Sequence, residues 1–310
     1  MAATALQTIV PIMLLVGVGF ASRKLGILKN GDQRVLSAYV YYWALPALLL
    51  ANIAETEFNA ETMRFMGAGI TPVLIVFFFY LIISKILHMS RNTRYMMTIS
   101  TIFGSWGFFG IPFVMFAFPT REAEKLAILS LVSIAVVSVT ISITLLEYQK
   151  METSTIWGGL YVVLKKLAKN PLIMSIAGGL AIALLGIKIP SLILKPIHML
   201  GSTTATVAIF LLGVFLYGRK YTNLTHALRL STLKAVFLPV IAFFTVGLFN
   251  LAEPHRSIIV LMHAMPVALS MIVLSERYDF NKETFASLIL ITSLAAGVYL
   301  NLWLLVLGHH

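Results

Sequence analysis

The sequence contains no cysteine and few charged residues. The missing cysteines exclude structural disulfides and thiolate metal sites. Charged residues make up 11% of the 310, whereas a soluble domain carries about 25%, so the chain cannot coat a water-facing surface. Zinc-ligand spacings, phosphate loops and nucleophile elbows are also missing. We therefore expect no metal site, no cofactor and no enzyme.

Apolar residues dominate what is present. They make up 59% of the chain, and the mean hydropathy is +0.92. Because about 20 apolar residues cross a bilayer as a helix, the runs predict an all-α membrane protein with about ten spans. The predicted spans are Thr4–Ala21, Gln33–Ala54, Met63–Leu87, Met96–Phe118, Leu126–Tyr148, Leu172–Ile187, Pro196–Tyr217, Leu228–Leu248, Ser257–Leu274 and Phe285–Leu307.

Basic residues alternate between the predicted connections. The connections after the odd-numbered spans, together with the adjoining ends of the spans, hold 17 of the 23 lysines and arginines, and those after the even-numbered spans hold six. The positive-inside rule makes the first set cytoplasmic, so both termini are predicted to be extracytoplasmic. Because the basic residues lie in short connections and not on one arm or face, we expect no nucleic acid partner.

The longest polar connection divides the chain into two sets of five spans. We expect one repeat over residues 1–148, a cytoplasmic connection over 149–170, and a second repeat over 171–310. An odd number of spans in each half places the halves in opposite orientations, which is the inverted-repeat pattern of secondary transporters.

Two long apolar stretches are interrupted at matching places in the two halves. Residues 104–112, GSWGFFGIP, interrupt the fourth stretch, and residues 263–266, HAMP, interrupt the ninth. Proline removes a backbone donor and glycine loosens the turn around it. Hydrocarbon cannot satisfy the freed groups, so such breaks face protein or a watery cavity. The pair predicts crossing broken helices around a transport site.

Several motifs resemble the auxin efflux carrier family. Residues 105–112, SWGFFGIP, are similar to its Asn-x-Gly-Phe-x-Gly-x-Pro signature. Further similar stretches follow in family order: GVGFASRKLGIL at 17–28, WALPALL at 43–49, KNPLI at 169–173 and MPVALSMIVLSERY at 265–278. The resemblance covers the whole chain. One departure is Ser105, where the family usually has asparagine.

The resemblance implies a ten-span fold that forms a homodimer. Spans one, two, six and seven would be a scaffold, and the other six the moving unit. Members export auxin in plants, and bacterial relatives are associated with malate, malonate and similar carboxylates. The short central connection here is similar to the prokaryotic type, which implies the plasma membrane of a prokaryote.

Elementary electrostatics also favours an organic anion as substrate. Pro112 and Pro266 suit the first turn of a resumed half-helix, whose free N–H groups and positive dipole end would face the crossover. A carboxylate placed there would gain several hydrogen bonds. The preceding half-helices end in carbonyl groups that could instead hold a cation, so the backbone alone leaves both open.

Side chains near the breaks complete the predicted site. His263 is either a substrate contact or proton-sensitive gate, or a neutral ring bonded to a freed carbonyl. Trp106 would stack on a substrate ring or pack between helices, and Lys234 is expected to snorkel to the inner surface. The candidate substrate-binding residues are Tyr42, Ser105, Trp106, Gly107, Gly110, Ile111, Pro112, His263, Met265, Pro266 and Val267.

The sequence leaves two classes of transporter open. The first is a carrier for a small organic anion, such as a dicarboxylate or an auxin-like carboxylate. The alternative is a sodium-coupled symporter of the bile-acid-transporter type, which shares crossed broken helices. Such a symporter usually places acidic or amide side chains at its crossover, and neither break contains one.

Overall fold

The computed structural model describes residues 2–150, 165, 168–218 and 221–309, and this part of the chain is helical with one isolated β-bridge. The prediction of an all-α protein is confirmed. The predicted cytoplasmic connection 149–170 lies mostly outside the described residues. The division into two inverted repeats and the count of ten spans remain predictions.

The chain folds into two compact units, each built from segments of both halves. Unit 1 comprises Met1–Met63, Gly107–Val132 and Ala168–Arg219, and unit 2 comprises Arg64–Trp106, Ser133–Leu167 and Lys220–His310. This division follows the scaffold and moving unit that the family resemblance implies, except that Gly107–Val132 joins unit 1. The helix α7 (Arg121–Lys150) contributes its first part to unit 1 and its remainder to unit 2.

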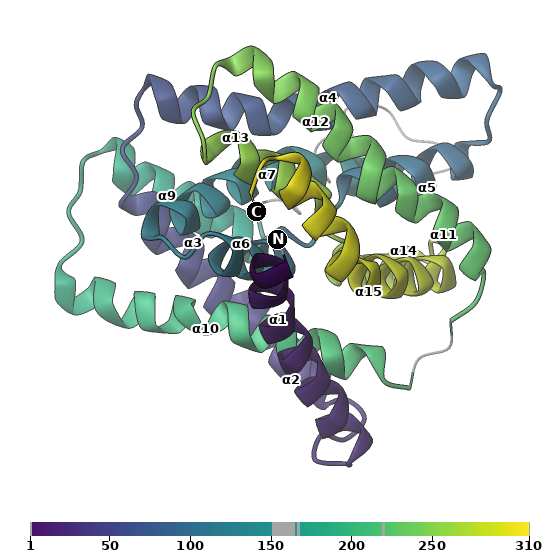
Figure 1. Cartoon of the computed structure of the whole chain (residues 1–310), viewed down its shortest axis with the longest axis horizontal. Helices are drawn as coiled ribbons and strands as arrows, with labels where there is room; N and C mark the ends of the chain where they lie inside the picture. The colour runs from purple at the N-terminus through teal and green to yellow at the C-terminus, as the bar shows by residue number, and fades with distance from the viewer. Residues whose placement is uncertain (1, 151–164, 166–167, 219–220, 310) are drawn as a thin grey trace. The chain divides into compact units, whose positions relative to one another are not determined.

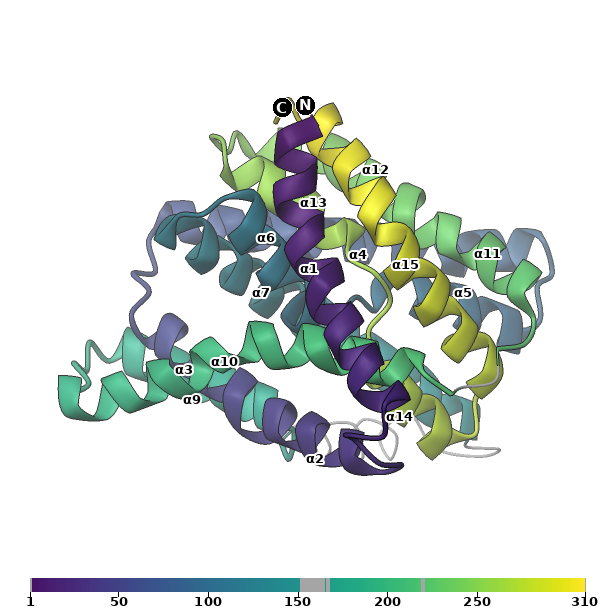
Figure 2. The same ribbon diagram turned by 60° about the horizontal axis from the view of Figure 1, so that its bottom comes forward.

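Besides the first part of α7, unit 1 contains the N-terminal and central helices (Figure 1). Their bounds are α1 (Ala2–Lys24), α2 (Asp32–Tyr39), η1 (Val40–Ala44), α3 (Leu45–Ala54), α6 (Ile111–Ala117), α9 (Pro171–Leu184) and α10 (Ser191–Leu216). Glycines let α1 and α10 cross closely (Figure 2). A Cβ on Gly19 would lie 2.0 Å from the carbonyl oxygen of Phe210, and one on Gly213 would lie 1.9 Å from that of Val16. Small residues commonly allow this approach between membrane helices.

Unit 2 contains the first half of the fourth predicted span and most of the C-terminal helices. Their bounds are α4 (Ala60–Ile86), which begins at the end of unit 1, α5 (Arg91–Ile102), α11 (Leu224–Thr232), η3 (Leu233–Phe237), α12 (Leu238–Val246), η4 (Gly247–Phe249), α13 (His255–Ala264), α14 (Ser270–Tyr278) and α15 (Lys282–Val306). The segment η2 (Trp106–Gly110) begins in unit 2 and continues in unit 1.

Three prolines follow wide helical turns. The π-helical segments η1, η2 and η3 each hold five residues, and each is followed by one residue and then Pro46, Pro112 or Pro239. Proline lacks an N–H and its ring clashes with the carbonyl four residues earlier. A π turn pairs residues five apart and relieves that conflict without ending the helix. In the fourth predicted span, α5 ends at Ile102 and helical structure resumes at Trp106. Residues 106–117 are then helical, with Pro112 accommodated by the π turn η2.

Six described helices are long and apolar enough to cross a membrane, and two shorter apolar helices accompany them. The long helices are Asp32–Ala54, Ala60–Ile86, Arg121–Gln149, Ser191–Leu216, Leu224–Phe249 and Lys282–Val306. Large apolar side chains such as Leu192, Phe244 and Val298 are exposed along them. Exposed apolar surface of this extent suits lipid, and it agrees with the predicted multi-pass membrane protein.

Candidate functional site

Both predicted helix breaks exist, and they meet inside unit 2. α5 ends at Ile102 and α13 ends at Ala264, and each is followed by non-helical chain. Gly104 pairs with Val267 as an antiparallel bridge, and the N–H of Ser105 donates to the carbonyl of Pro266 at 2.7 Å. The predicted meeting of the two breaks is confirmed, and we call this junction the crossover.

The first break lies earlier in the chain than the sequence indicated. The non-helical residues are Phe103, Gly104 and Ser105, whereas the predicted interruption covers residues 104–112, of which 106–112 are helical. Pro112 is therefore not the start of the resumed half-helix, because helical structure already begins at Trp106. The glycine at the break is Gly104.

The second resumed helix also begins later than predicted. α14 starts at Ser270, four residues beyond Pro266. The N–H groups around its start have partners within unit 2: that of Val267 donates to Thr292 Oγ1 at 3.2 Å and that of Ala268 to the carbonyl of Phe103 at 3.3 Å. The N–H groups of Met271 and Ile272 bond within the turn. The prediction that the resumed helix begins at Pro266 is therefore wrong, and anion binding at this helix end stays a prediction.

His263 is fully buried in the last turn of α13. Its Nε2 lies 3.0 Å from the carbonyl oxygen of Gly69 in α4. Because a carbonyl only accepts, Nε2 carries the hydrogen, and in the neutral ring Nδ1 offers a lone pair. Nδ1 has no hydrogen-bond partner among the described residues. Of the two predicted roles, the carbonyl-bonded ring is the one observed, and Nδ1 remains available to a ligand.

Lys234 does not snorkel to the inner surface. It lies in the π turn η3 with no exposed side chain, and its ammonium has no hydrogen-bond partner among the described residues. The nitrogen Nζ lies 5.8 Å from the centre of the Trp106 ring. The structure therefore adds a buried lysine nitrogen to the crossover, and the sequence prediction for this residue is wrong.

Trp106 places a second nitrogen beside Lys234. The indole is 4% exposed, and its Nε1 has no hydrogen-bond partner among the described residues. A Cβ built on Gly104 would lie 2.7 Å from Trp106 Nε1 and 3.0 Å from Lys234 Nζ. Both nitrogens therefore lie close to Gly104 on the side where a Cβ would project, and a larger residue there would have to displace them.

A family model described as "Membrane transport protein" matches residues 4–304. The chain belongs to this family. The predicted resemblance to auxin efflux carriers is thereby confirmed.

Relatives of this membrane transport protein span nearly its whole length. An uncharacterized transporter of Methanocaldococcus jannaschii is 22% identical over 96% of this chain and 97% of its own. The uncharacterized transporter YfdV of Escherichia coli is 25% identical over 96% of both chains. A protein of Rhizobium meliloti named "Putative malonate transporter" is 23% identical over 92% of this chain and 90% of its own.

The other predicted site residues of the transporter lie in both units. Ser105, Trp106, His263, Met265, Pro266 and Val267 belong to unit 2, and Tyr42, Gly107, Gly110, Ile111 and Pro112 belong to unit 1. A Cβ on Gly107 would lie 2.9 Å from Leu45 Cδ2, so a larger residue there would have to shift the end of that side chain within unit 1. Tyr42 is 57% exposed and contacts the ring of Tyr41.

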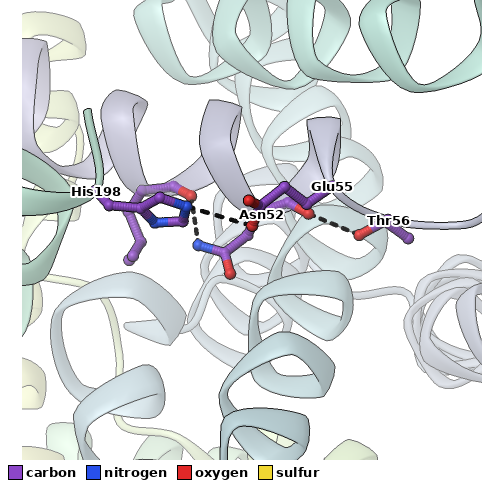
Figure 3. A network of polar contacts seen from close by, with 5 residues as sticks. Asn52, Glu55, Thr56 and His198 are labelled. Carbon is purple, nitrogen blue, oxygen red and sulfur yellow. Dashed lines mark hydrogen bonds and ion pairs between the residues drawn. The ribbon is translucent and has the colours of Figure 1, made fainter. Parts of the chain in front are cut away.

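Unit 1 of the transporter holds a second polar region, an open cavity of about 970 Å³ that the sequence did not reveal. We call it the basic cavity; its charged lining residues are Glu55, Arg121, Glu124, Lys125, Lys188 and Lys195. His198 Nε2 lies 3.3 Å from Glu55 Oε2, and Asn52 Nδ2 donates to the carbonyl of Leu48 at 2.9 Å (Figure 3). Arg121, Lys125, Lys188 and Lys195 are four of the six basic residues that are predicted to lie on the extracytoplasmic side.

Proposed function

We propose that this membrane transporter is a secondary carrier that moves a small organic anion by alternating access around the crossover. The observation that carries the proposal is the meeting of two non-helical chain breaks within a membrane protein. Backbone of this kind is tolerated at membrane depth only where it is buried in protein or lines a watery cavity. Broken helices that meet are the usual setting for a substrate site in secondary transporters.

The charge at the crossover supports an anion. The ionisable side chains buried there, Lys234 and His263, are both nitrogen bases. Glu147 is the one carboxylate among the buried described residues, and it accepts a hydrogen bond from Tyr278. The sodium-coupled alternative finds no support, because a sodium site needs oxygen ligands and gains from acidic ones. The relative named for malonate agrees in substrate class.

The division into two units supports a rocking mechanism. Unit 1 takes the place of the scaffold and unit 2 that of the moving unit, with the substrate held by unit 2 at its chain breaks. The proposed carrier is a homodimer in the plasma membrane of a prokaryote, with both termini extracytoplasmic. A reporter fused after Leu307 that reads as cytoplasmic would overturn this orientation and the inverted repeat with it.

The decisive experiment compares uptake of an organic acid with uptake of its amide. Purified protein in liposomes should transport labelled malonate or butyrate, in sodium-free buffer as well as with sodium. Malonamide and butyramide should not compete. Equal competition by acid and amide, or uptake that requires sodium, would contradict the proposed function.

A further inference from the structure

We infer that Lys234 Nζ and Trp106 Nε1, which converge beside Gly104, together bind one carboxylate of the transported acid. This inference rests on the proposed function and assigns the contacts that recognise the substrate. The first reason is the state of the ammonium. A buried charge is strongly unfavourable unless it is paired, and Lys234 is fully buried with no hydrogen-bond partner among the described residues.

The second reason is the convergence of two unsatisfied donors. The indole N–H of Trp106 is also buried without a partner, and the same virtual Cβ on Gly104 meets both nitrogens at 2.7 and 3.0 Å. A carboxylate has two oxygens that accept from paired donors, and charge-assisted bonds of this kind are the strong ones. Glycine at position 104 lets both nitrogens lie this close to the backbone and to each other.

The third reason is that three backbone N–H groups of the crossover are already bonded. Those of Ser105, Val267 and Ala268 donate within unit 2. We therefore assign the recognition of negative charge to side chains. Lys234 and Trp106 are the buried donors at the crossover that remain unpaired among the described residues, while neutral His263 offers a lone pair.

The charge count also limits the substrate. Among the buried described residues, Lys234 is the sole lysine or arginine. One cation balances one carboxylate, so we expect the site to prefer an acid that carries a single negative charge. A second ionised carboxylate would be buried without a counter-charge.

The test is calorimetric binding by the purified full chain in detergent. The probes are benzoate, butyrate and malonate with their neutral partners benzamide, butyramide and malonamide. The variant K234M keeps the volume and removes the charge, W106F keeps a ring and removes the donor, and K85M is the matched control at an exposed lysine. Gel filtration and thermal unfolding establish that each variant is folded.

For the unchanged protein we expect the acids to bind about tenfold or more tightly than their amides, with benzoate or butyrate tighter than malonate at neutral pH. K234M should remove the acid preference, W106F should weaken acid binding severalfold with little change for the amides, and K85M should change neither. If the unchanged protein binds acids and amides equally, the proposed function itself fails. If it prefers acids, and folded K234M or W106F prefers them equally, the assignment of this pair is wrong.

Discussion

In the crossover of unit 2, a fully buried ammonium has no partner among the described residues. In the basic cavity of unit 1, six charged side chains share open space, and Glu55 and His198 there are 37% and 41% exposed. Water and salt screen the second set, so its interactions are weak and fade beyond about one screening length. The first set is desolvated, so its interactions are stronger and less screened. A site that recognises a substrate and a surface that attracts it therefore differ mainly in burial.

The largest effect is expected from adding a side chain at Gly104. Gly104→Ala places a Cβ 2.7 Å from Trp106 Nε1 and 3.0 Å from Lys234 Nζ, so it should displace both nitrogens and abolish measurable acid binding. Overpacking of this kind typically costs about 1–3 kcal/mol. Gly247→Ala is the control, because no atom lies within 4 Å of its Cβ position. Normal calorimetric binding by Gly104→Ala would mean that the crossover is not the site.

A smaller effect is expected from removing charge in the basic cavity. The double variant Lys188→Gln, Lys195→Gln should slow uptake of labelled butyrate about severalfold at low salt, because the cavity attracts anions before they bind. The difference should vanish at 1 M salt, where the screening length is about 3 Å. Equilibrium affinity at the crossover should not change. A loss of affinity that persists at high salt would place the binding site in the cavity.

The Glu55–His198 pair should contribute less still. Both side chains are more than a third exposed and their nitrogen and oxygen lie 3.3 Å apart. Exposed pairs typically contribute about 0–1 kcal/mol, so Glu55→Gln should shift thermal unfolding by little and leave acid binding unchanged. A large drop in the unfolding temperature would show that this open cavity is held together by its charges.

The smallest effect concerns Asp279, at the exposed end of α14. Its carboxylate lies 2.6 Å from Lys282 Nζ, and this hydrogen bond and charge lower the pKa of Asp279 below its ordinary value. A depressed pKa favours folding above the ordinary carboxyl pKa, and that contribution is lost as pH falls through the lower value. Asp279→Asn should therefore unfold slightly more readily at pH 7, and the difference should close in acid. A difference that grows in acid would contradict this sign.

The helical class, the membrane setting and the two breaks could be predicted from the sequence because each follows from local composition. Apolar length predicts a span, and Gly or Pro inside it predicts a break. The position of the first break was predicted too late in the chain, because a π turn accommodates Pro112 and the break falls on Gly104. A proline inside an apolar run predicts the end of a helix, whereas one widened turn allows the helix to continue through it.

The site was harder to predict because it depends on which face a side chain occupies. Lys234 stands two turns into its span, where a lysine ordinarily reaches the surface. The signal available in the sequence is its position five residues before Pro239, which is close to the six residues that separate Trp106 from Pro112. The occupied N–H groups at Val267 and Ala268 could not be foreseen, because their partners come from α15 and the first break.

The π turn that contains Lys234 also fixes a rotation about the helix axis. Successive residues of an α-helix are turned by about 100°, and a π turn uses one more residue before its hydrogen bond closes. The helix α11 is thus rotated by about that angle relative to an unbroken helix ending at the same Pro239. Deleting one residue from Leu233–Phe237 would shorten the span by only about 1.5 Å. It would nevertheless carry every side chain of α11 to a different face, so the orientation of this span depends on residue number as well as on residue type.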